Sequence, residues 1–171
     1  FSYTAVILSI IFFVFAMLIL LKVKNSYPAV FLALYMLAVA VWIGANAGAD
    51  VSSTDFLLIF WSGTAVVGAS FFISLYLCFV DSFINERFPK KINIFLYLLP
   101  ATILSLFGFS HYSVVATFYP SNSPAQIIPG SLYYFYTAFL FSGLLYGGIR
   151  LAMSYWHASS QKKKQILYME L

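Results

Sequence analysis

The side chains of this sequence that could bind another molecule lie near the ends of long apolar runs. One such run ends in the stretch WIGANAGAD, where Asn46 supplies an amide and Asp50 a carboxylate. An amide can donate and accept hydrogen bonds, and aromatic rings offer flat apolar surfaces with a polar edge. Such residues could line an outward-facing pocket, and the candidate ligand-binding residues are Asn46, Asp50, Trp61, His111, Tyr112, Tyr133 and Tyr134.

Patterns typical of a catalytic centre are absent from the sequence. It contains no phosphate-binding glycine loop, no G-x-S-x-G turn and no pair of histidines at metal-ligand spacing. Asp81, Glu86 and Glu170 lie among basic residues, and we expect them to be solvated charges. Cys78 is the single cysteine, so an internal disulfide cannot form. We therefore expect no catalysis, no metal site and no cofactor within these residues.

The composition indicates a chain that resides in lipid. Of its 171 residues, 63% are hydrophobic and only 8% are charged, and the mean hydropathy is +0.93. A soluble domain carries roughly 25% charged residues. So few charges cannot cover a surface that faces water. The fold class that we expect is an all-α membrane protein, because lipid cannot satisfy the open edge of a sheet.

Five apolar runs are candidates for membrane-spanning helices. A helix needs about 20 apolar residues to cross a hydrocarbon core of ~30 Å. We predict a polytopic helical bundle with five transmembrane helices that forms one transmembrane domain over residues 1–171. The chain begins at Phe1 rather than Met, and we expect it to be a piece of a longer protein. The predicted spans are about 3–21, 28–49, 56–80, 92–108 and 131–153.

The basic residues predict the orientation of these spans. All nine Lys and Arg residues follow span one, lie between spans three and four, or close and follow span five. Short loops that carry basic residues remain in the cytoplasm, where they face anionic lipids. We therefore predict an N-terminus outside and a C-terminus in the cytoplasm. The cations act as topology anchors, so the net charge of +4 does not indicate a nucleic-acid partner.

Glycines at helical spacing predict close contacts between the spans. Helices in a bilayer associate through tight packing and hydrogen bonds, because lipid tails are as apolar as leucine. Asn46 lies among such small residues and has two interpretations. It bonds to a neighbouring helix, or it lines an outward-facing cavity that ends at Asp50. The glycines expected to pack helices are Gly44, Gly48, Gly63, Gly68, Gly143 and Gly147.

The longest connection, residues 109–130, contains three prolines that exclude a continuous helix. Its segment HYSVVATFY is rich in β-branched and aromatic residues, which is typical of a short strand or of a segment on the membrane surface. The connection either caps an outward pocket, with His111 and Tyr112 at the mouth, or contacts lipid headgroups through its aromatic rings.

Several landmarks follow one another in a distinctive order along nearly the whole chain. They are the aromatic pair Phe60-Trp61, Pro100 in span four, the pair His111-Tyr112, Gly130 with Tyr133 and Tyr134, and a basic, glutamine-containing stretch after span five. In this order they resemble the seven-transmembrane N-terminal sensor region of bacterial histidine kinases. That family has seven spans, whereas five are present here. It often has a proline in span three, where this chain reads Gly68-Ala69-Ser70.

The resemblance implies a sensory input module in the bacterial inner (cytoplasmic) membrane. Such a module detects a small or lipophilic signal and relays a helix movement to a cytoplasmic output domain. The resemblance also implies a homodimer in contact with membrane lipid, and a kinase domain in the full-length protein beyond these residues. Two other readings remain open, a fragment of a small-molecule transporter and a structural subunit of a larger membrane complex.

Overall fold

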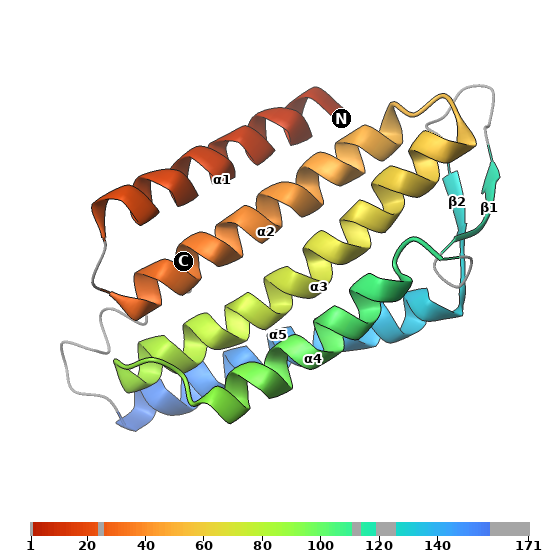
Figure 1. Cartoon of the computed structure of the whole chain (residues 1–171). Helices are drawn as coiled ribbons and strands as arrows, with labels where there is room; N and C mark the ends of the chain where they lie inside the picture. The colour runs from red at the N-terminus through yellow and green to blue at the C-terminus, as the bar shows by residue number, and fades with distance from the viewer. Residues whose placement is uncertain (1, 24–25, 111–113, 119–125, 158–171) are drawn as a thin grey trace.

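The computed structural model of the chain describes residues 2–23, 26–110, 114–118 and 126–157 (Figure 1). The described part is almost entirely helical, as predicted, with one short hairpin in the connection between the last two helices. The helices are α1 (Ser2–Lys22), α2 (Tyr27–Asp50), α3 (Asp55–Asn85), α4 (Lys91–Phe107) and α5 (Ser131–His157), and the strands are β1 (Val114–Phe118) and β2 (Gln126–Pro129).

Four of the described helices, α1, α2, α3 and α5, are long and apolar enough to cross a membrane. The fifth, α4, is apolar but has only 17 residues. The count of five spans and their orientation therefore remain predictions. Helix α3 has 31 residues and continues to Asn85, beyond the predicted end at residue 80.

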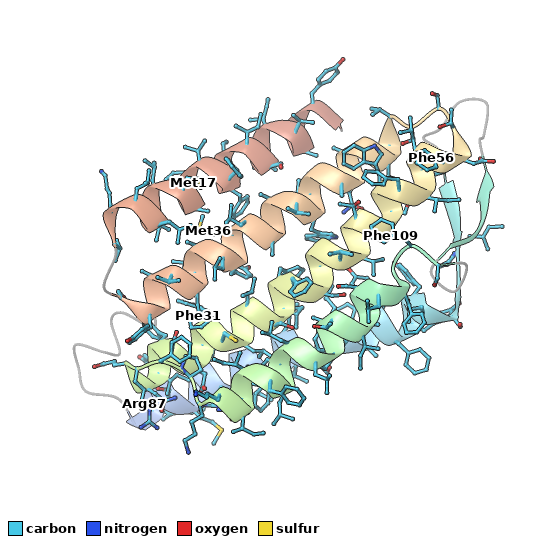
Figure 2. The ribbon with its side chains drawn as sticks, viewed as in Figure 1. Met17, Phe31, Met36, Phe56, Arg87 and Phe109 are labelled. Atoms are coloured by element: carbon cyan, nitrogen blue, oxygen red, sulfur yellow. The ribbon has the colours of Figure 1, made fainter. Side chains whose placement is uncertain are left out.

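The helices lie side by side in chain order from α1 to α4, and α5 lies behind α3 and α4 (Figure 1). Helix α3 consequently contacts α2, α4 and α5. The core forms where these four helices meet, around the fully buried Ile73 of α3. The outer side of α1 projects apolar side chains away from the bundle (Figure 2). A large exposed apolar surface of this kind suits contact with lipid.

Local signals explain where the helices begin and end. Pro28 lies in the first turn of α2, where its missing N–H removes no helical hydrogen bond. The Thr54 hydroxyl accepts a hydrogen bond of 3.3 Å from the Leu57 amide and caps α3. At the other end of α3, Glu86 has a left-handed backbone with φ of 53°, which turns the chain towards α4.

Glycines mark the closest approaches between the helices. A Cβ atom on Gly68 would lie 2.8 Å from the backbone nitrogen of Trp42, so α2 and α3 approach almost backbone to backbone there. A Cβ atom on Gly44 would lie 3.0 Å from the Ser9 hydroxyl oxygen of α1. The other four glycines predicted to pack helices each face a side chain, namely Trp61 for Gly48, Phe109 for Gly63, Ile73 for Gly143 and Tyr76 for Gly147.

Two serine hydroxyls join neighbouring helices. Ser9 donates a hydrogen bond of 2.8 Å to the Ala40 carbonyl and so links α1 to α2. Ser74 donates one of 2.6 Å to the Tyr97 carbonyl and links α3 to α4. Because lipid offers no competing partner, such bonds help to hold helices together in a membrane.

We predict that Ser74→Ala will lower the free energy of unfolding by about 0.6–1.7 kcal/mol, between the average and the largest value measured for bonds between membrane helices. The variant loses the bond to the Tyr97 carbonyl, whereas Thr102→Val loses only a bond within α4, to Leu98. Steric-trapping measurements in bicelles give both free energies. An equal effect of the two substitutions would show that the α3–α4 bond contributes nothing.

Candidate functional site

Helices α2, α3 and α5 line a small, partly open cavity near the α2–α3 turn, which we call the interhelical cavity. Its volume of about 180 Å³ is below the roughly 300–1,000 Å³ of sites for drug-sized ligands, so it suits a small molecule. Two of the predicted binding residues, Asn46 and Tyr133, face it from opposite helices. The complete lining consists of Trp42, Asn46, Ser62, Ala65, Val66, Tyr133 and Tyr136.

The cavity has one amide, that of Asn46, besides the hydroxyls of Ser62, Tyr133 and Tyr136 and the Trp42 indole N–H. The Asn46 Nδ2 atom donates a hydrogen bond of 2.7 Å to the Trp42 carbonyl, one turn earlier in the same helix. That bond fixes the amide and uses one of its two hydrogens. The described residues provide no hydrogen bond from Asn46 to another helix. Asn46 is exposed, and its Oδ1 atom and second amide hydrogen remain able to bond a molecule in the cavity.

Aromatic rings form the opposite wall. The ring of Tyr133 lies 5.8 Å from that of Tyr136, which is only 8% exposed. On α2, the Trp42 ring packs against Phe72 of the core at 5.4 Å. The lining thus combines one amide with fixed aromatic surfaces, which is suited to orienting a small, partly apolar molecule.

The other predicted binding residues lie elsewhere. Trp61 packs against Gly48 and faces α1 instead of the interhelical cavity. Asp50 is exposed at the end of α2, and Tyr134 is exposed on α5. His111 and Tyr112 lie outside the described residues. In the part of the chain that the structure describes, the cavity therefore brings together Asn46 and Tyr133 from the predicted set.

A larger groove of about 560 Å³ lies between α1, α2 and α3, on the Trp61 side of α3. Its polar side chains are Ser9 and Thr64. Both hydroxyls already donate to backbone carbonyls, Ser9 to Ala40 and Thr64 to Phe60. The groove therefore presents a mainly apolar surface, with the Trp61 indole N–H as its remaining side-chain donor among the described residues.

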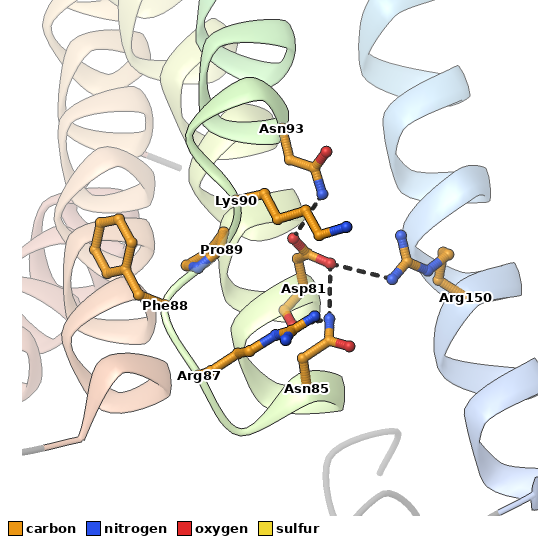
Figure 3. A pocket seen from close by; sticks show the side chains of 8 residues that line it. All are labelled: Asp81, Asn85, Arg87, Phe88, Pro89, Lys90, Asn93 and Arg150. Carbon is orange, nitrogen blue, oxygen red and sulfur yellow. Dashed lines mark hydrogen bonds and ion pairs between the residues drawn. The ribbon is translucent and has the colours of Figure 1, made fainter.

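A polar junction around Asp81 joins α3, α4 and α5 at the opposite end of the bundle (Figure 3). Arg150 of α5 contacts Oδ1 of Asp81 at 3.1 Å, and Asn85 donates to the same oxygen at 3.0 Å. Asn93 of α4 donates to Oδ2 at 3.0 Å. We call these four residues the Asp81 junction. It connects three helices through one carboxylate.

The expectation that Asp81 is a solvated charge is wrong. The residue is only 3% exposed, because donors on three helices surround its carboxylate. Arg150 keeps 31% of its side chain exposed and also donates to the Tyr146 hydroxyl at 3.2 Å. A carboxylate can be buried at modest cost only when both oxygens are paired in this manner.

The geometry supports binding and helix coupling. Among the described residues, no group of three or more His, Cys, Asp or Glu side chains is placed to hold a metal ion. The interhelical cavity and the Asp81 junction share α3 and α5, at opposite ends of the bundle. Helix α5 thus contacts both features.

Comparison with known proteins covers almost the whole chain. A family model described as the N-terminal 7TM region of histidine kinase matches residues 4–171. The matched range includes the residues of the interhelical cavity and of the Asp81 junction. Searches of the curated proteins and of the solved structures return no match.

Proposed function

We infer the function from the family to which this chain belongs, the N-terminal 7TM regions of histidine kinases. Members of this family are sensor regions in the membrane and are not catalytic. The chain is thus a sensory input module for signal transduction. The kinase that it controls lies elsewhere in the full-length protein, which we propose to be a homodimer in the bacterial inner membrane.

We propose that all five helices cross the membrane, with the basic ends in the cytoplasm. The short helix α4 supports this arrangement, because the exposed large side chains that follow its basic first residue, Lys91, are all apolar, as lipid contact requires. They are Ile92, Phe95, Leu96, Leu99, Ile103, Leu106 and Phe107. In this orientation the interhelical cavity lies in the outer half of the bundle and the Asp81 junction at the cytoplasmic end.

The proposed signal is a small amphiphile that binds in the interhelical cavity. The observation that carries this proposal is the Asn46 amide, which is held by its own helix and faces a cavity between three helices. A ligand there contacts α2, α3 and α5 together. It can shift the output only by binding more tightly to one packing of these helices than to another.

The relay runs through α5. Tyr133 lies in its first turn, and Arg150 joins the Asp81 junction five turns later. A rotation or shift of α5 at the cavity changes the position of Arg150 against Asp81. The cytoplasmic output domain then receives the movement from the end of α5.

We predict that Asn46→Leu in the full-length protein will raise the midpoint of the dose–response curve at least tenfold. Two hydrogen bonds to the ligand are lost, and 1.4 kcal/mol corresponds to a factor of about ten. The measurement is autophosphorylation in nanodiscs at increasing concentrations of one ligand, the most active member of a panel of small amphiphiles. Tyr133→Leu should also raise the midpoint of the dose–response curve.

The matched control is Tyr134→Leu, which removes an exposed neighbouring ring outside the cavity. It should leave the midpoint of the dose–response curve within twofold of the native value. If Asn46→Leu and Tyr133→Leu leave the midpoint unchanged while the native protein responds, the signal does not bind in the interhelical cavity.

A further inference from the structure

A second pocket adjoins the Asp81 junction at the turn between α3 and α4, and we call it the turn pocket (Figure 3). Its volume is about 200 Å³. The lining consists of Asp81, Asn85, Arg87, Phe88, Pro89, Lys90, Asn93 and Arg150. We propose that the turn pocket binds a phosphate group, which is carried by an anionic lipid or is free in solution.

The charges of the pocket carry this proposal. Three cations and one carboxylate line it, so its formal charge is +3 − 1 = +2. The carboxylate of Asp81 is already paired with Arg150, and both of its oxygens accept further bonds from asparagine amides. Within the described residues, neither Arg87 nor Lys90 forms an ion pair. These two cations are thus available to an anion.

The turn that carries these cations is held in place. Phe88 packs edge-on against Tyr27 of α2 at 5.4 Å and against Phe31 at 5.7 Å. Pro89 restricts the backbone between the two basic residues. Little conformational freedom of the turn is therefore lost when a ligand binds.

Phosphate matches the groups that the pocket offers. The planar guanidinium of Arg87 can contact two phosphate oxygens at once, and the Lys90 ammonium adds a compact charge. Helix α4 begins at Lys91, so its positive N-terminal end adds to the attraction. Phe88, which lines the pocket, is an exposed apolar residue along which an acyl chain could lie.

The test compares two double variants that remove the same charge. R87Q/K90Q changes the turn pocket, whereas K22Q/K91Q removes two cations that do not line it. Native mass spectrometry of the full chain in a neutral maltoside detergent measures retention of phosphatidylglycerol and of phosphatidylcholine. We expect R87Q/K90Q to weaken phosphatidylglycerol binding at least tenfold. K22Q/K91Q should change it less than twofold, and the charge-conserving R87K/K90R should retain most of the binding.

Inorganic phosphate distinguishes the two sources of the ligand. If phosphatidylglycerol remains bound in millimolar phosphate, the pocket selects the lipid headgroup. If phosphate binds the native chain, displaces the lipid and is lost in R87Q/K90Q, the pocket takes the free anion. Equal losses in both glutamine variants, or binding of neither phosphatidylglycerol nor phosphate, would overturn the proposal. The test does not depend on signal detection, because it measures no kinase output.

Discussion

Asp81→Leu is expected to lower the free energy of unfolding by about 3 kcal/mol, the lower end of the range for breaking a buried ion pair. The substitution leaves Arg150 without its carboxylate and the Asn93 amide without its acceptor, whereas Asn85 keeps its bond of 2.8 Å to the Asp81 backbone carbonyl. The upper end of the range is not expected, because Arg150 keeps 31% of its side chain exposed and water can partly solvate it. Unfolding by steric trapping in bicelles provides the measurement.

A double-mutant cycle separates the ion pair from the packing around it. Asp81→Leu combined with Arg150→Met removes both charges, and it should restore at least half of the lost stability. Asp50→Leu removes an exposed carboxylate at the end of α2 and should change the free energy by no more than about 0.5 kcal/mol. If the double variant loses as much stability as Asp81→Leu and Arg150→Met lose together when measured singly, Asp81 and Arg150 do not stabilise each other.

Gly143→Val is expected to destabilise the bundle by a similar amount, about 3 kcal/mol, at the upper end of the range for overpacking. A Cβ atom at this position would meet the Ile73 side chain, which is fully buried and cannot move aside. The substitution therefore separates α5 from α3. In the full-length protein it should also reduce the response to the signal, because α5 contacts both the cavity and the junction.

The chain contains a matched control for this prediction. Gly148 lies five residues later in the same helix, and a Cβ atom there would have nothing within 4 Å. Gly148→Val should stay within about 0.5 kcal/mol of the native stability. If both valine variants have the same free energy of unfolding, the loss of stability comes from helix propensity or insertion and not from the contact with Ile73.

The helices could be predicted because lipid imposes simple requirements on them. Helix α1 ends at Lys22, the first cation after an apolar run, and α2 begins beside Pro28. The predicted membrane span ends at about residue 80, just before Asp81, which the sequence alone suggests is a solvated charge. Since the carboxylate is paired with three donors, the helix continues past it to Asn85.

The sequence indicates the end of each helix at which the candidate residues lie, but not the side of the helix on which they face. Asn46, Trp61, Tyr133 and Tyr134 all lie near the same end of their helices, yet only Asn46 and Tyr133 share the cavity. Apolar residues face both lipid and core in a membrane bundle, so the sequence does not indicate the rotation of each helix. Nor does it indicate which of the nine basic residues pairs with Asp81. The Asp81-to-Asn85 spacing of one helical turn was the available signal.

In the proposed five-span arrangement, the unequal lengths of α3 and α4 would make the bundle sensitive to bilayer thickness. At 1.5 Å per residue, the 31 residues of α3 extend about 46 Å and the 17 of α4 about 26 Å, against ~30 Å of hydrocarbon. In the five-span arrangement, α3 must tilt or protrude, whereas lipids beside α4 must compress. Ser74 and Asn93 tether the two helices. A change in membrane thickness therefore strains those tethers.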